Sequence, residues 1–138
     1  MHSQIDLDPT HGVIRLTVLE ESVTLECAED VYRHLAELKS RGGSYAAIYD
    51  LSMAKGTTIP TEMVREFARR RPPLPMDKKH VVVGKETNIY GLARLFSICG
   101  DNVGKEFEVV HTLEEAYDIV GARPEDFTQR LFPVPIAA

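Results

Sequence analysis

The chain has 138 residues, 16 of them Lys or Arg and 21 Asp or Glu, which gives a formal charge of −5 with His neutral. This length suits one domain, and 43% apolar with 27% charged residues is typical of a folded globular protein, so a disordered or fibrous chain is excluded. The acidic balance argues against a nucleic-acid partner, and no apolar run approaches the ~18 residues of a transmembrane segment.

Hydrophobic periodicity and turn residues divide the chain into an opening hairpin and then alternating helices and strands. Thr24 and Thr112 are expected helix N-caps, Thr112 within a capping box with Glu115, and Gly121 is expected to end the last helix. In chain order, the expected elements are strands 4–7 and 13–19, helix 24–39, strand 45–50, helix 60–71, strand 80–83, helix 89–98, strand 107–110 and helix 112–120. Residues 124–131 are expected to add one or two helical turns, and residues 132–135 to be extended.

The order ββαβαβαβα predicts an α/β fold with a mixed, mostly parallel sheet and helices packed on it. We expect one domain over residues 1–121 and a C-terminal extension over residues 122–138. The N-terminus lacks the basic and apolar regions of a signal peptide, so a cytoplasmic protein is expected.

Several segments together resemble the SpoIIAA-like family, which is grouped with STAS and CRAL-TRIO domains, over residues 4–121. They are Tyr49-Asp50-Leu51-Ser52, Pro72-Pro73, residues 91–96 (GLARLF), residues 107–110 (FEVV) and residues 112–117 (TLEEAY). The resemblance implies a single-domain STAS-like fold and a small, non-enzymatic regulatory module that engages a protein partner or a ligand.

The resemblance also implies a regulatory alternative. Anti-sigma-factor antagonists of the wider fold are phosphorylated on a Ser that follows an Asp, at the start of the second helix. The corresponding segment here is residues 57–61, TTIPT, in which the D-S-[S/T]-G pattern is absent. Thr57 or Thr58 as a phosphoacceptor is therefore one hypothesis, and Thr58 as a simple helix cap is the plainer one.

No group of residues predicts catalysis, a metal or another cofactor. The two cysteines, Cys27 and Cys99, are far apart and are expected to be structural, and no His pair has metal-ligand spacing. His80 and His111 are expected to be half-exposed residues at strand ends. The competing enzyme hypothesis uses Asp50 with Lys85, because both follow strands of the predicted sheet.

Candidate ligand or partner residues follow the strand ends, where α/β sheets bind their ligands. The loop of residues 84–88 opens a helix, a position that suits an anion. The next helix is unusually apolar at Tyr90, Leu92, Leu95, Phe96 and Ile98, which predicts either core packing or an apolar groove. The candidate residues are Asp50, Ser52, Thr57, Thr58, Lys85, Asn88, Tyr90 and Arg94.

The charges are unevenly distributed along the chain, because residues 1–30 are strongly acidic while residues 69–79 are basic. The basic residues are Arg69, Arg70, Arg71, Lys78 and Lys79. They suit an acidic protein partner, an anionic lipid surface or the acidic end of a second copy in a homodimer. The plainer interpretation is a solvated helix end.

Overall fold

A six-stranded sheet forms the centre of the structure, a computed structural model that describes residues 2–42, 44–69, 78–99 and 107–133. In chain order the elements are β1 (Ser3–Asp8), β2 (Val13–Val18), β3 (Ser22–Val23), α1 (Leu25–Ser40), β4 (Ala46–Asp50), β5 (Gly56–Thr57), α2 (Thr61–Arg69), β6 (His80–Val83), α3 (Thr87–Cys99), β7 (Glu108–Val110), α4 (Leu113–Val120), the 3-10 helix η1 (Pro124–Asp126) and β8 (Gln129–Phe132).

The strands lie in the order β7-β6-β4-β2-β1-β8. The neighbouring pairs β2–β4, β4–β6 and β6–β7 are parallel, whereas β1 is antiparallel to both of its neighbours. The short strands β3 and β5 pair separately as a small parallel ribbon. The predicted α/β fold with a mostly parallel, mixed sheet is confirmed.

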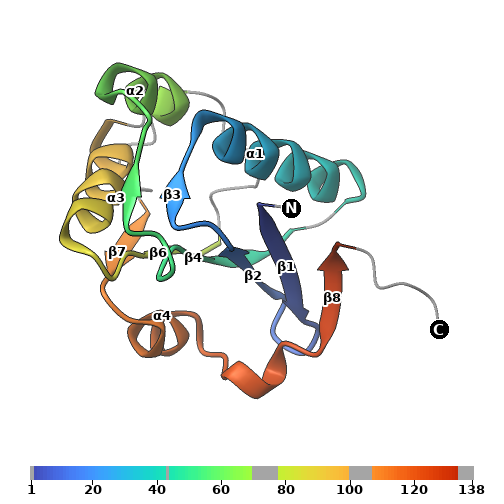
Figure 1. Ribbon diagram of the computed structural model, residues 1–138. Coiled ribbons are helices and arrows are strands. Elements are labelled where there is room, and N and C mark those ends of the chain that lie inside the picture. Colours follow the sequence, from blue (N-terminus) through green and yellow to red (C-terminus); the bar gives the residue numbers. More distant parts are fainter. Residues whose placement is uncertain (1, 43, 70–77, 100–106, 134–138) are drawn as a thin grey trace.

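The helices are divided unequally between the two faces of the sheet. Figure 1 shows α1, α2, α3 and the β3–β5 ribbon on one side, and α4 on the other. Side chains alternate along β2, so that Ile14, Leu16 and Val18 join the core under α1, while Val13 joins the core under α4. The sheet therefore separates two hydrophobic cores.

The predicted helix ends are confirmed where a side chain or a glycine defines them. The Thr24 and Thr112 hydroxyls accept hydrogen bonds from the amides of Cys27 and Glu115, and Gly121 adopts a left-handed conformation with φ 74°. The expected cap at Thr58 is wrong, because α2 begins only at Thr61.

The C-terminal segment departs most from the sequence-based expectation. Only residues 124–126 form a helical turn, and residues 129–132 instead pair with β1 as the edge strand β8. Two contacts hold this strand: Nε of Arg130 donates to Asp6 at 2.6 Å, and the Phe132 ring packs on His34 of α1 with centroids 3.7 Å apart. The described part of the expected extension thus packs with the domain, through the η1 turn and the edge strand β8.

Replacing Arg130 with Ala should therefore destabilise the protein, because Asp6 is only 6% exposed and would lose its closest cationic partner. We expect a loss of about 1–3 kcal/mol in the free energy of unfolding, measured by urea denaturation. Arg41→Ala is the matched control, since its ion pair with Glu37 is exposed and should contribute less than about 0.5 kcal/mol. Equal effects of the two substitutions would contradict the role given to Arg130.

Candidate functional site

An apolar pocket of about 180 Å³ lies between the helices and the sheet; we call it the helix-face pocket. Its floor comes from β2, β4 and β6, and its walls come from α1, α2 and α3. The described lining residues are Leu16, Val18, Val23, Cys27, Ala28, Val31, Tyr32, Leu35, Tyr49, Leu51, Ile59, Val64, Phe67, Val82, Leu92, Ala93, Phe96 and Phe107.

Ordinary sequence periodicity places these side chains around one space. In β2, alternate residues Leu16 and Val18 face the helices, and in α1 the steps from Ala28 to Val31 and Leu35 keep one helical face toward the pocket. The helices α1 and α2 meet where the Tyr32 hydroxyl donates to the carbonyl oxygen of Phe67 at 3.1 Å. This contact joins two walls of the pocket.

Aromatic rings form another part of the lining. The Phe107 ring lies 5.4 Å from Phe96 and 5.6 Å from Tyr49, measured between centroids. The Tyr49 hydroxyl lies 2.9 Å from Nδ1 of His80, and burial raises the pKa of Tyr49, so the phenol stays neutral at physiological pH. The polar end of Tyr49 is thus held by the protein itself.

No described residue of the lining is an Asp, Glu, Lys, Arg or His. Cys27 contributes a thiol and is 1% exposed. Burial raises the pKa of this thiol, and the negative charges of Glu20 and Asp30 act in the same direction. A protonated, buried thiol is a poor nucleophile, so the described lining can bind through apolar contact but supplies no evident acid, base or nucleophile.

The residues expected at the strand ends lie outside this lining. Asp50 is buried, and its Oδ1 accepts hydrogen bonds from the amide of Ser52 at 2.9 Å and from the Ser52 hydroxyl. The Thr57 hydroxyl donates to the carbonyl of Val23 at 2.8 Å and accepts from the amide of Ile59 at 3.0 Å. These side chains stabilise the loop between β4 and α2, and Thr58 is exposed beside them.

The loop expected to bind an anion also makes internal hydrogen bonds. The Gly84 amide donates to the carbonyl of Val110 at 2.9 Å, and the side-chain amide of Asn88 donates to the carbonyl of Lys55 at 2.8 Å. Lys85 is exposed. The structure thus brings this loop against the β4–α2 loop, and the Gly84 amide and the Asn88 side chain are already bonded to the protein.

Gly84→Ala should destabilise the protein, because an added Cβ would lie 2.9 Å from the backbone nitrogen of Tyr90 and 3.0 Å from its Cα. We expect a loss of about 1–3 kcal/mol in thermal or urea denaturation, since backbone of α3 must move. Gly91→Ala is the control on the same helix: its Cβ meets nothing within 4 Å, and Ala should gain about 0.5–1 kcal/mol. A neutral Gly84→Ala would contradict this close packing of loop and helix.

The groove hypothesis for the apolar helix is supported at two positions. Leu92 and Phe96 line the helix-face pocket, whereas Tyr90 turns away and stacks on His111 at 4.0 Å between ring centroids. Arg94 is exposed on α3, and the side chain of Ile98 lies outside the described part. Sequence reasoning missed other lining residues, such as Tyr49 and Val31. These residues follow the same hydrophobic periodicity as core residues, and that periodicity does not distinguish the wall of a pocket from a filled core.

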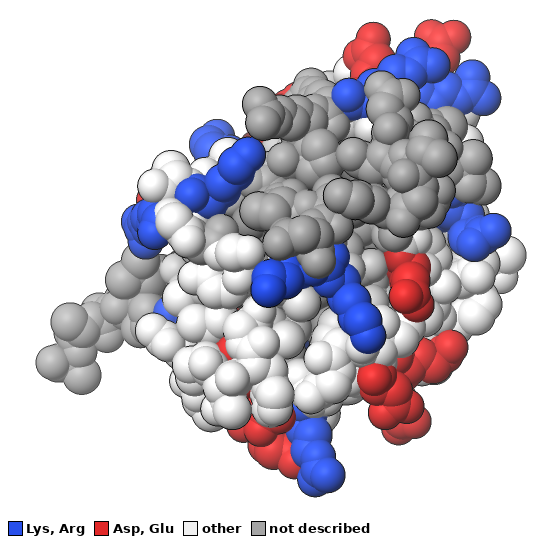
Figure 2. All heavy atoms as spheres, turned by 180° about the vertical axis from the view of Figure 1, so that it is seen from behind, with Lys and Arg blue, Asp and Glu red and all other residues white. Residues whose placement is uncertain are grey.

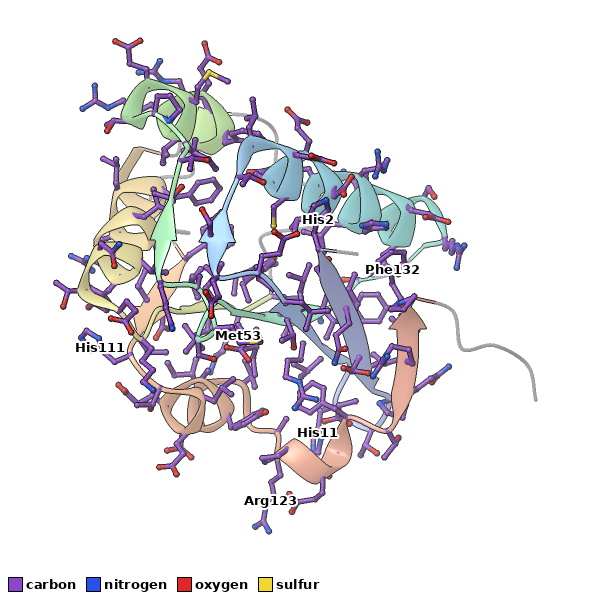
Figure 3. The ribbon with its side chains drawn as sticks, in the orientation of Figure 1. His2, His11, Met53, His111, Arg123 and Phe132 are labelled. Atoms are coloured by element: carbon purple, nitrogen blue, oxygen red, sulfur yellow. The ribbon has the colours of Figure 1, made fainter. Side chains whose placement is uncertain are left out.

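The histidines occupy unlike environments. His80 is 4% exposed, so the expectation of a half-exposed residue is wrong for it. His111 is exposed and follows β7, at the opposite end of the β6–β7 pair from His80. A hydrogen bond to the Glu20 carboxylate raises the pKa of His2, and Asp30 and Glu26 lie near its other ring nitrogen. Figure 3 shows His2 at the start of β1.

Asp8, His11 and Asp126 form a further cluster, with one potential ligand atom from each within 4.8 Å of the others. Nδ1 of His11 lies 2.5 Å from Asp8, which also accepts from the amides of Thr10 and His11. Asp126 accepts from the amide of Arg123 in the η1 turn, and Figure 3 shows His11 beside this turn. These hydrogen bonds stabilise the β1–β2 turn and the η1 turn separately, and the two turns meet where Nδ1 of His11 lies 3.8 Å from Asp126.

The basic segment is described only in part. Arg69, Lys78 and Lys79 are exposed, and Nζ of Lys79 donates to the carbonyl of Ile119 at 3.1 Å. Arg70 and Arg71 lie outside the described residues. Figure 2 shows both positive and negative side chains on one face of the molecule. Binding of an acidic partner or surface to this segment stays a prediction.

Comparison of the chain with models of known protein families finds no match, and comparison with curated protein sequences finds none either. Among the described helices, none has the length and apolar character needed to cross a membrane.

Proposed function

We propose that this protein is a small, non-enzymatic binding domain of the STAS or SpoIIAA-like type, which holds an apolar ligand in the helix-face pocket. One observation carries the proposal: about 180 Å³ of space is lined by apolar and aromatic side chains in a protein whose interior should otherwise be closely packed. A regulatory role would follow if ligand binding changed the surface of the helices that a protein partner contacts.

The size of the pocket supports ligand binding in place of a packing defect. An engineered cavity of roughly 150 Å³, lined by similar side chains, stays dry and binds benzene. Empty space of this kind lacks dispersion contacts, so a ligand that fills it stabilises the folded protein in proportion to its affinity and concentration.

The phosphorylation alternative has less support at Thr57, because its hydroxyl already forms two hydrogen bonds within the protein. Modification there would have to release both. The enzyme alternative would draw on Asp50 and Lys85, of which the first is bonded to Ser52 and neither lines the pocket. Binding without bond chemistry is the function that the described side chains support best.

Toluene is a suitable first probe because it is small, uncharged and apolar. We expect it to shift the backbone amide NMR signals around Val31, Tyr49 and Phe96 and to raise the melting temperature. Ala28→Phe should weaken this binding at least tenfold, because Ala28 lines the pocket and a phenyl group at that position would occupy the space.

Ala36→Phe is the matched control, since Ala36 is exposed on the same helix and should leave binding unchanged. Urea denaturation of both variants checks that they fold. Absence of toluene binding to the wild-type protein, or equal binding to a folded Ala28→Phe variant, would contradict the proposed function.

A further inference from the structure

The size and the charge of the helix-face pocket limit the ligand more narrowly than the proposed function does. We infer that its ligand is an uncharged molecule of about one ring, in place of a long-chain fatty acid or phospholipid. This inference rests on the proposed function and adds the chemical class of the ligand.

The volume of the helix-face pocket limits the size of the ligand. Sites for drug-sized ligands typically measure about 300–1,000 Å³, so a pocket of about 180 Å³ lies below that range. It lies close to the ~150 Å³ that accommodates a single benzene ring. A ring with a short alkyl chain would fill such a space, whereas most of a long acyl chain would lie outside the apolar walls, on the side of the pocket that is open to solvent.

The side chains of the described lining limit the charge of the ligand. Within the described lining, the polar side-chain groups are the thiol of Cys27 and the hydroxyls of Tyr32 and Tyr49. The Tyr32 hydroxyl donates to the carbonyl of Phe67, and the Tyr49 hydroxyl lies at hydrogen-bond distance from His80. Burial raises the pKa values of Tyr49 and Cys27, so both side chains stay neutral. A carboxylate inside these walls would lose its hydration without gaining a cationic partner, which strongly disfavours a charged ligand.

The aromatic side chains around the pocket favour a ligand that contains a ring. Five of the lining residues are aromatic: Tyr32, Tyr49, Phe67, Phe96 and Phe107. Their rings meet one another at tilted and edge-on angles, as in the pair of Tyr49 and Phe107 at 89°. Ring edges and faces of this kind suit a further ring, which can add the same offset or edge-to-face contacts.

A homologous series of ligands measures the capacity of the pocket directly. Benzene, toluene and alkylbenzenes up to octylbenzene would be titrated into the full chain and followed by calorimetry and NMR. Each added methylene should tighten binding about fourfold while it still fits. The improvement should stop before octylbenzene, once the space is full.

Ala28→Leu provides an independent check on that limit. The larger side chain adds about three carbons to the wall of the pocket, so the limit should move to a shorter alkyl chain. Ala36→Leu, at an exposed position of α1, should leave the limit unchanged. Benzoate, which has the size of toluene but carries a charge at pH 7.5, should bind at least 100-fold more weakly than toluene.

The outcomes separate the inference from the proposed function. A limit short of octylbenzene that moves with Ala28→Leu, together with weak benzoate binding, supports the inference. Affinity that continues to rise to octylbenzene, or benzoate binding equal to that of toluene, overturns the inference while leaving an apolar binding function in place. Failure of every member of the series to bind overturns the proposed function itself.

Discussion

The packing of three helices on one face of the sheet is the constraint on which the pocket depends. Six strands with about 4.8 Å between neighbours make a sheet about 24 Å wide, which is more than two helices of about 10 Å can cover. Here α1 packs on the core of β1, β2 and β4, while α3 lies toward β7, and α2 packs chiefly on α3. The space between α1 and α3 becomes the helix-face pocket, which is partly open to solvent and is bordered by the contact of Tyr32 with Phe67 of α2.

The opposite face of the same sheet shows what complete covering looks like. There α4 and η1 place Ala116, Tyr117, Ala122 and Phe127 on the strand residues, and all four are buried. Arg15 is held between them, since it donates to the Tyr117 hydroxyl at 2.7 Å and its guanidinium lies 4.7 Å from the centre of the Phe127 ring. The two faces therefore differ in packing: α4 and the residues around η1 close one of them, and the other contains the helix-face pocket.

The sequence predicted the main order of strands and helices because that order depends on local periodicity, caps and turns. Thr24, Thr112 and Gly121 act within one or two helical turns, so their signals survive in any tertiary context. Strand β8 could not be predicted in this way, because Arg130 finds its partner Asp6 at the other end of the chain. The 3-10 turn before it was visible only as a Pro followed by two acidic residues.

The candidate site was less predictable than the fold. The sequence directed attention to polar residues after the strands, and in the structure Asp50, Thr57 and Asn88 use their side chains to hold loops together. The apolar character of α3 was the useful signal, since Leu92 and Phe96 do line the pocket. The placement of the helices on the sheet decides whether apolar residues pack tightly or leave a space. That placement depends on contacts between distant segments, so the sequence of one segment does not predict it.

The proposed function requires the space between α1, α3 and the sheet to be empty of protein and accessible to small apolar molecules. Diffraction from crystals pressurised with xenon tests this accessibility most directly, because xenon enters apolar cavities of this size and scatters strongly. We expect one well-occupied xenon site in contact with Val31, Tyr49 and Phe96. A pocket without xenon, filled by the protein's own side chains, would contradict it.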